Sequence, residues 1–137
     1  MGEKLMGKEK IEDLVLIRDN AILQNLFTML QKNGADLEFN RSILNKAYAM
    51  AGRYIEDRVL EDSKANRAAL ASRGVKIYRE EYQDDFIIFY HYTSRGYTDK
   101  FGVTRDVLRS EISWRLAGYI SELGQALKEA RQHAKRP

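Results

Sequence analysis

Residues 75–101, VKIYREEYQDDFIIFYHYTSRGYTDKF, decide the fold class, because the spacing of apolar residues changes here from helical to alternating. β-Branched and aromatic side chains predict strands over residues 75–81 and 86–93, with a turn between them. The Ser94-Arg95-Gly96 turn then predicts a short third strand over residues 97–101. We expect an antiparallel β-hairpin or a three-stranded meander. Residues 86–92 are apolar or aromatic at nearly every position, which predicts a central strand with both faces covered.

Helical patterns precede this β segment. From Ile11 to Leu30 the apolar residues recur at intervals of three and four, which predicts an amphipathic helix that ends at residues 33–34, Asn-Gly. Asp19 and Asn20 are both helix-capping residues, so a break at this point is an alternative.

A second helical pattern follows Asn40, a favourable N-cap. Its C-terminal part has two interpretations. Asp62 and Ser63 cap a separate short helix that ends at residue 72, or one long helix continues to Arg73 with Gly74 at its end.

The last segment predicts a long amphipathic helix that begins near the candidate cap Thr104 and keeps one apolar face as far as Leu127. N-terminal helices, a small antiparallel sheet and a long C-terminal helix define an α+β fold. We expect one domain over residues 1–137, with residues 1–8 and 129–137 frayed.

The composition narrows the class of protein. Of the 137 residues 44% are apolar, which is enough for one core, and the net charge is +3. The chain has no cysteine, which excludes disulfides and thiolate chemistry and favours a cytoplasmic location. No apolar run reaches the length of about 20 residues that crosses a bilayer, so we expect no membrane partner.

No residue pattern is typical of catalysis or of metal binding. The two histidines are His91, in an apolar strand, and His133, in a basic tail, and neither has an evident ligand or nucleophile beside it. We expect His91 to be a partly buried strand residue. No glycine-rich phosphate loop occurs. We therefore predict no catalytic residue, no metal, no cofactor and no enzymatic activity.

Two surfaces are candidates for contacts with partners. Residues 63–79 carry five positive side chains and no acid, which indicates a nucleic-acid partner if the charges share one face. Trp114 lies at the margin of the apolar stripe of the last helix, next to Arg115, either at the edge of the core or on a contact surface. A long helix with such a margin predicts a homodimer.

Residues 68–75, AALASRGV, followed by residues 86–96, FIIFYHYTSRG, resemble the end of the recognition helix and the wing of winged-helix transcription regulators. The resemblance covers about a quarter of the chain, and the acidic hairpin tip over residues 80–85 departs from the pattern. It implies that Lys64, Asn66 and Arg67 face the major groove and that Arg73, Lys76 and Arg79 contact phosphates.

The Ser-Arg-Gly-Tyr turn before an arginine-rich helix also resembles small uncharacterised cytosolic proteins of spore-forming Firmicutes, a resemblance that implies no activity. The leading hypothesis is a non-enzymatic binding or regulatory protein with a nucleic-acid partner. The alternative is a protein-interaction module that acts as a homodimer or on another protein, and a small enzyme of unknown type is third.

Overall fold

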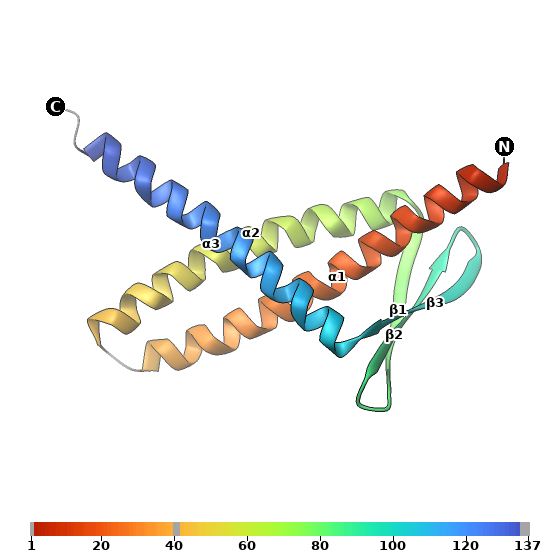
Figure 1. The fold of residues 1–137 in the computed structure, drawn as a ribbon, viewed down its shortest axis with the longest axis horizontal. Helices are drawn as coiled ribbons and strands as arrows, with labels where there is room; N and C mark the ends of the chain where they lie inside the picture. The colour runs from red at the N-terminus through yellow and green to blue at the C-terminus, as the bar shows by residue number, and fades with distance from the viewer. Residues whose placement is uncertain (1, 40–41, 135–137) are drawn as a thin grey trace.

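The computed structural model of the chain describes residues 2–39 and 42–134. Over these residues the chain forms three helices and three strands in the order α1 (Gly2–Phe39), α2 (Ile43–Ser72), β1 (Val75–Gln83), β2 (Ile87–Ser94), β3 (Tyr97–Thr104) and α3 (Arg105–Ala134). The predicted α+β class is confirmed. α1 and α2 form an antiparallel hairpin of helices, and α3 crosses this hairpin (Figure 1).

α1 is one continuous helix, so the predicted end at residues 33–34 and the alternative break at Asp19 and Asn20 are both wrong. Aspartate and asparagine disrupt a helix when their side chains bond to nearby backbone. Here both side chains have distant partners: Asp19 accepts a hydrogen bond from Arg115 of α3 at 2.9 Å, and Asn20 donates one to Asn66 of α2 at 3.1 Å. Gly34 costs a helix about 1 kcal/mol relative to alanine, which is small beside the packing of α1 along α2.

α2 is also continuous, and the alternative of a separate short helix from Asp62 and Ser63 is wrong. The backbone N–H of Asn45 donates a hydrogen bond to Ser42 Oγ at 3.1 Å, so Ser42 caps the start of α2. The predicted cap, Asn40, lies outside the described residues. At the other end Gly74 has a φ of 70°, the left-handed conformation that commonly ends a helix, as the one-helix interpretation predicted.

The strands form an antiparallel meander in the order β1-β2-β3, with β2 in the centre as predicted. The β2-β3 connection is a two-residue loop whose members, Arg95 and Gly96, have φ values of 50° and 88°. This pair of positive φ values is typical of a type I′ turn, whose twist suits a tight hairpin. The pairing of β1 with β2 shifts register between Ile77 and Arg79, so Tyr78 is the extra residue of a β-bulge.

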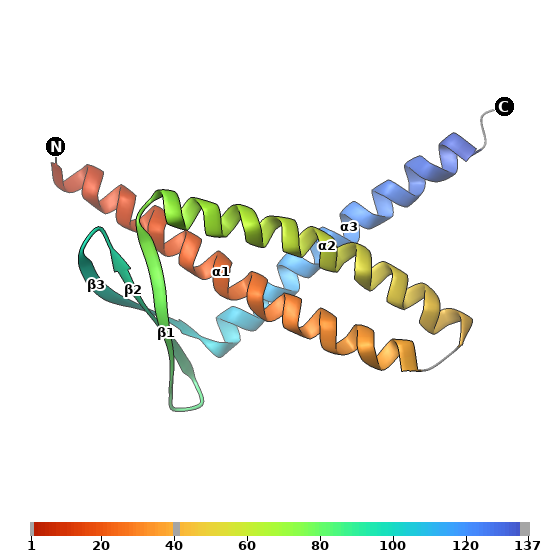
Figure 2. The ribbon, with the colours of Figure 1, turned by 180° about the vertical axis from the view of Figure 1, so that it is seen from behind.

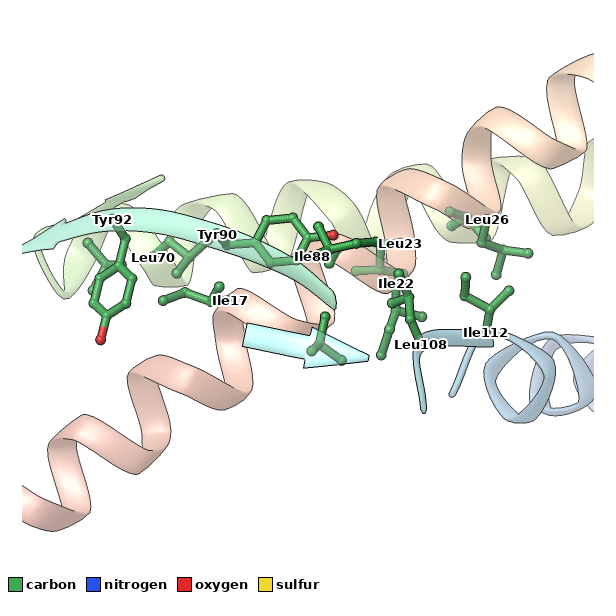
Figure 3. Packing of buried hydrophobic residues seen from close by; sticks show 14 of the residues in the cluster. Ile17, Ile22, Leu23, Leu26, Leu70, Ile88, Tyr90, Tyr92, Leu108 and Ile112 are labelled. Atoms are coloured by element: carbon green, nitrogen blue, oxygen red, sulfur yellow. The ribbon is translucent and has the colours of Figure 1, made fainter. Parts of the chain in front are cut away.

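The core lies between one face of the sheet and the three helices. Ile88, Tyr90 and Tyr92 of β2 are buried and point toward the helices, in one cluster with Ile17 of α1 and Leu70 of α2 (Figure 3). α3 contributes buried side chains to the same cluster near the end of β3. This face of the sheet therefore joins all three helices.

The other face of β2 is only half-buried, so the prediction that both faces are covered is wrong. Ile87, Phe89 and His91 on this face are half-buried, and side chains of the neighbouring strands lie beside Phe89 and His91. The ammonium group of Lys100 lies 4.5 Å from the centre of the Phe89 ring, and the ring centres of Tyr78 and His91 are 6.1 Å apart. We call this surface the outer sheet face.

α3 begins where the sequence predicted, because Thr104 Oγ1 accepts a hydrogen bond from the backbone N–H of Val107 at 3.2 Å. Its first half packs on the core through Leu108, Ile112 and Tyr119. Its second half extends away from the α1–α2 hairpin, which both views of the ribbon show (Figures 1 and 2). Helix thus occupies most of the two terminal segments that we expected to fray.

Candidate functional site

The six residues that were predicted to contact nucleic acid differ in whether their side chains are free or are bonded to other residues of the protein. Lys64, Arg67 and Lys76 are exposed, and within the described part of the chain they form no hydrogen bond or ion pair. Their charges are therefore available to a partner. The other three, Asn66, Arg73 and Arg79, form hydrogen bonds or ion pairs with other residues of the protein.

Asn66 is a structural residue and not an accessible contact, since it is only 7% exposed. Its side-chain amide donates a hydrogen bond to the carbonyl oxygen of Leu16 at 2.9 Å, and its carbonyl accepts one from Asn20 at 3.1 Å. Buried amides are stable only when such bonds are made. Asn66 therefore joins α2 to α1, and in this fold it does not face a DNA groove.

Arg73 holds the end of α2 to the N-terminal half of α1. Its Nε lies 2.6 Å from Asp13 Oδ1, and its Nη1 lies 3.0 Å from Glu12 Oε2. The hydrogen bond to Asp13 raises the pKa of the Arg73 guanidinium above its usual value. The buried Asp13 carboxylate also accepts a hydrogen bond from Ser94 Oγ at 3.2 Å. The charge of Arg73 is thus compensated before any phosphate arrives.

Arg79 belongs to a charged cluster on the outer sheet face with Glu81 and His91. His91 Nε2 lies 2.6 Å from Glu81 Oε2, and Arg79 Nη2 lies 3.2 Å from the same carboxylate oxygen. The hydrogen bond from His91 holds the pKa of Glu81 below its usual range. His91 is partly buried, as predicted, but it has an orienting acid that the sequence analysis did not identify.

A cleft of about 410 Å³, which we call the β1 cleft, runs along the free side of β1. Its walls are residues 75–80 of β1, Arg67, Leu70 and Ala71 of α2, and Asn20 and Gln24 of α1. It brings together three of the predicted basic residues, Arg67, Lys76 and Arg79. The buried hydroxyl of Tyr90, which also lines this cleft, has no hydrogen-bond partner within the described residues.

The two residues of the predicted partner contact on α3, Trp114 and Arg115, also differ: the first is exposed and the second is bonded to α1. Trp114 is 77% exposed, so it lies on the surface and not at the edge of the core, and its contact with a partner stays a prediction. Arg115 points into the protein instead and donates a hydrogen bond to Asp19 at 2.9 Å. Arg115 therefore fixes α3 on α1 and is not a free contact.

The winged-helix resemblance requires a separate recognition helix before the wing. α2 is continuous through Asp62 and Ser63, and β1 begins directly after its end. The end of α2 is held to α1 by Asn66 and Arg73, so this segment is part of the helical hairpin and does not project from it.

Within the described residues no group of three or more His, Asp or Glu side chains that could hold a metal ion occurs. His91 and Glu81 lie on the outer sheet face, outside the walls of the β1 cleft. Among the helices of residues 2–39 and 42–134, none carries an apolar stretch that could span a bilayer.

These features define a two-layer α+β protein, in which a helical hairpin and a third long helix cover one face of a three-stranded antiparallel meander. The chain belongs to the YhjD protein family, since the model of that family matches residues 8–124. Searches of curated proteins and of solved structures gave no match.

Two features of these surfaces were missed by the sequence analysis. The β1 cleft depends on α1 and α2 lying beside an edge strand, which no local pattern shows. The apolar stripe of α3 was recognised as one face from Val103 to Leu127, but the sequence did not show that beyond Tyr119 the core covers it only in part, with Leu123 half-buried and Ile120 and Leu127 exposed. The available signal was that Ile120 and Leu127 lie far along the sequence from any predicted strand, so that the predicted sheet would not be expected to cover them.

Proposed function

We propose that this protein is a non-enzymatic interaction protein of the cytoplasm that works as a homodimer paired through the second half of α3. The observation that carries the proposal is an apolar seam on this helix, formed by Leu116, Ile120, Leu123 and Leu127. Ile120 and Leu127 are 53% and 62% exposed, while Leu116 and Leu123 are half-buried against the core.

The spacing of the seam residues supports helix pairing. The intervals of four, three and four residues correspond to the a and d positions of a heptad repeat, the pattern with which two helices pack side by side. The seam lies where α3 leaves the α1–α2 hairpin (Figure 1). A second copy of α3 therefore has access to the exposed half of the seam.

The accessible surface of the chain is large enough to include a dimer interface. It measures 10142 Å², whereas a compact monomer of 15.9 kDa exposes about 7,400 Å². The difference of about 2,700 Å² exceeds the roughly 800 Å² per partner of a standard protein interface. A homodimer buries part of this surplus with the same patch on both copies.

Trp114 is a second exposed apolar side chain of α3, on the side of the helix opposite to the seam. It is 77% exposed and shares its side of α3 with the small residues Ala117 and Gly118, which leave space around the indole. Tryptophan side chains in such positions contribute strongly to protein interfaces.

Light scattering coupled to size exclusion tests the proposal. We expect the unmodified protein to elute with twice the mass of 15.9 kDa at tens of micromolar. Ile120→Glu together with Leu127→Glu places four charges in the paired seam and should yield monomers, because each buried apolar side chain contributes about 1.5–3 kcal/mol.

Ile11→Glu is the matched control, since Ile11 is an isoleucine of similar exposure on the surface of α1. It should leave the dimer intact. A monomeric mass for the unmodified protein, or an unchanged dimer in the Ile120 and Leu127 double variant, contradicts the proposal.

A further inference from the structure

One wall of the β1 cleft is an open strand edge. β1 is an outer strand of the sheet, and within the described residues no backbone hydrogen bond joins its free side to another segment. Six consecutive residues, 75–80, line the cleft along this edge. An edge of this kind is a template on which another strand can pair.

The opposite wall has an apolar part, formed by α2, and a fixed position. Leu70 and Ala71 of α2 face β1 across the cleft, and Ile77 of β1 packs partly into the core beside them. The end of α2 is held in place by Arg73, whose bond to Asp13 ties it to α1. The width of the cleft is therefore set by the fold.

The charges around the cleft are predominantly positive at one end. Arg67 on α2 and Lys76 on β1 have no intramolecular partner within the described residues. Arg79 adds a third positive side chain on the same strand, although Glu81 compensates it in part. Glu80, at the far end of the cleft, is the single acid on its walls.

We propose that the β1 cleft binds an extended peptide segment of alternating acidic and apolar residues, which adds to the sheet as a fourth strand beside β1. The backbone of the peptide bonds to the free edge, as in other cases of strand addition. Its apolar side chains pack toward Leu70 and Ile77, and its carboxylates on the other side meet Lys76 and Arg79. Arg67 lies on the helical wall and attracts the same acidic segment.

The dimensions agree with this occupant. Six strand residues extend over about 20 Å, so a peptide of about the same number of residues fills the cleft. The proposal does not depend on the α3 seam, because none of the seam residues lines the β1 cleft. If the protein proved to be a monomer, the proposal for the β1 cleft would be unaffected.

Fluorescence anisotropy with synthetic peptides tests the proposal. The probe is a fluorescein-labelled peptide of about eight residues that alternates valine and glutamate. Three control peptides have the same length. One alternates valine and lysine. The other two are the valine-glutamate peptide N-methylated at every second residue, one in each register, so that each lacks the backbone donors of one edge. We expect the probe to bind and the lysine peptide and at least one N-methylated peptide to bind at least about tenfold more weakly.

Variants of the protein locate the site. Arg67→Glu should weaken binding of the valine-glutamate peptide by about tenfold, because it replaces an attraction by a repulsion. Lys64→Glu is the matched control: Lys64 lies one turn away on the same helix, is equally unpaired and does not line the cleft. It should change the affinity much less. Circular dichroism confirms that both variants fold.

Four results would overturn the proposal. Equal binding of the probe and of both N-methylated peptides means that charge alone attracts the peptide. Equal effects of Arg67→Glu and Lys64→Glu mean that the cleft is not the site. Tighter binding of a single-stranded oligothymidine than of the probe assigns the surface to nucleic acid. Absence of binding up to about 1 mM probe rejects peptide recognition at this edge.

Discussion

Replacing Asn66 by alanine tests whether this residue belongs to the fold or to a nucleic-acid surface. The substitution removes two hydrogen bonds, the one donated to the Leu16 carbonyl at 2.9 Å and the one accepted from Asn20 at 3.1 Å. Leu16 can keep the bond that its carbonyl makes within the helix. The amide of Asn20, which is 8% exposed, loses its partner.

The expected cost follows from this asymmetry. A buried donor left without a partner costs about 1–3 kcal/mol, so we expect Asn66→Ala to lower the free energy of unfolding by about 2 kcal/mol. The entropy of unfolding is about 2.1 cal/mol/K per residue, which for 137 residues gives about 0.29 kcal/mol/K. The melting temperature should therefore fall by about 7 °C.

Thermal unfolding followed by circular dichroism measures this shift. Asn20→Ala and the double variant complete a cycle, in which the double variant should be less destabilised than the sum of the two single variants, since neither orphaned amide remains. An unchanged melting temperature for Asn66→Ala, or strictly additive effects in the cycle, would refute the role of Asn66 as a buried link between α1 and α2.

Two further predictions concern the outer sheet face. A Cβ atom on Gly102 would lie 2.7 Å from the Phe89 ring, so Gly102→Ala should lower the free energy of unfolding by about 1 kcal/mol. In a Phe89→Ala background the same substitution should cost almost nothing, because the ring is absent. Gly52→Ala is the control and should not destabilise the protein, since its Cβ meets no atom within 4 Å. The pKa of Glu81 is lowered mainly by the hydrogen bond from His91, so its contribution to stability is present at neutral pH and is lost as pH falls through a pKa below 4.5. Glu81→Gln should therefore melt below the unmodified protein at pH 7, and this difference should shrink as the pH is lowered below 4.5; a difference that stays constant down to the acid limit of folding would contradict this.

Much of the fold was predictable because its signals are local. The β-branched and aromatic residues of the segment 86–93, the Arg95-Gly96 turn and the Thr104 cap are local signals, and the strand, the turn and the helix start that they predict are confirmed. The continuity of α1 was not predicted, because residues 33–34, Asn-Gly, have the composition of a helix end, and Asp19 and Asn20 have that of a cap but bond to Arg115 and Asn66. Only the folded chain brings these partners together.

The candidate surface was predictable only in part, for a related reason. The sequence shows how many positive charges the basic run contains, but it does not show which of them are compensated by acidic side chains in the folded protein. Arg73 is neutralised by Asp13, 60 positions earlier in the chain, whereas Arg67 stays free on the same helix. Burial divides the run in the same way, since Asn66 lies on the side of α2 that faces α1 while Lys64 and Arg67 do not.

The central position of α1 has a consequence for synthesis on the ribosome. α1 emerges first, yet Asp19 must wait for Arg115, 96 positions later, and Ile22 and Leu26 for the α3 side chains that lie beside them (Figure 3). At about 5–20 residues per second this interval lasts about 5–20 s. The nascent chain therefore carries a finished helical hairpin with one apolar side open, and this side is available to chaperones until translation reaches α3.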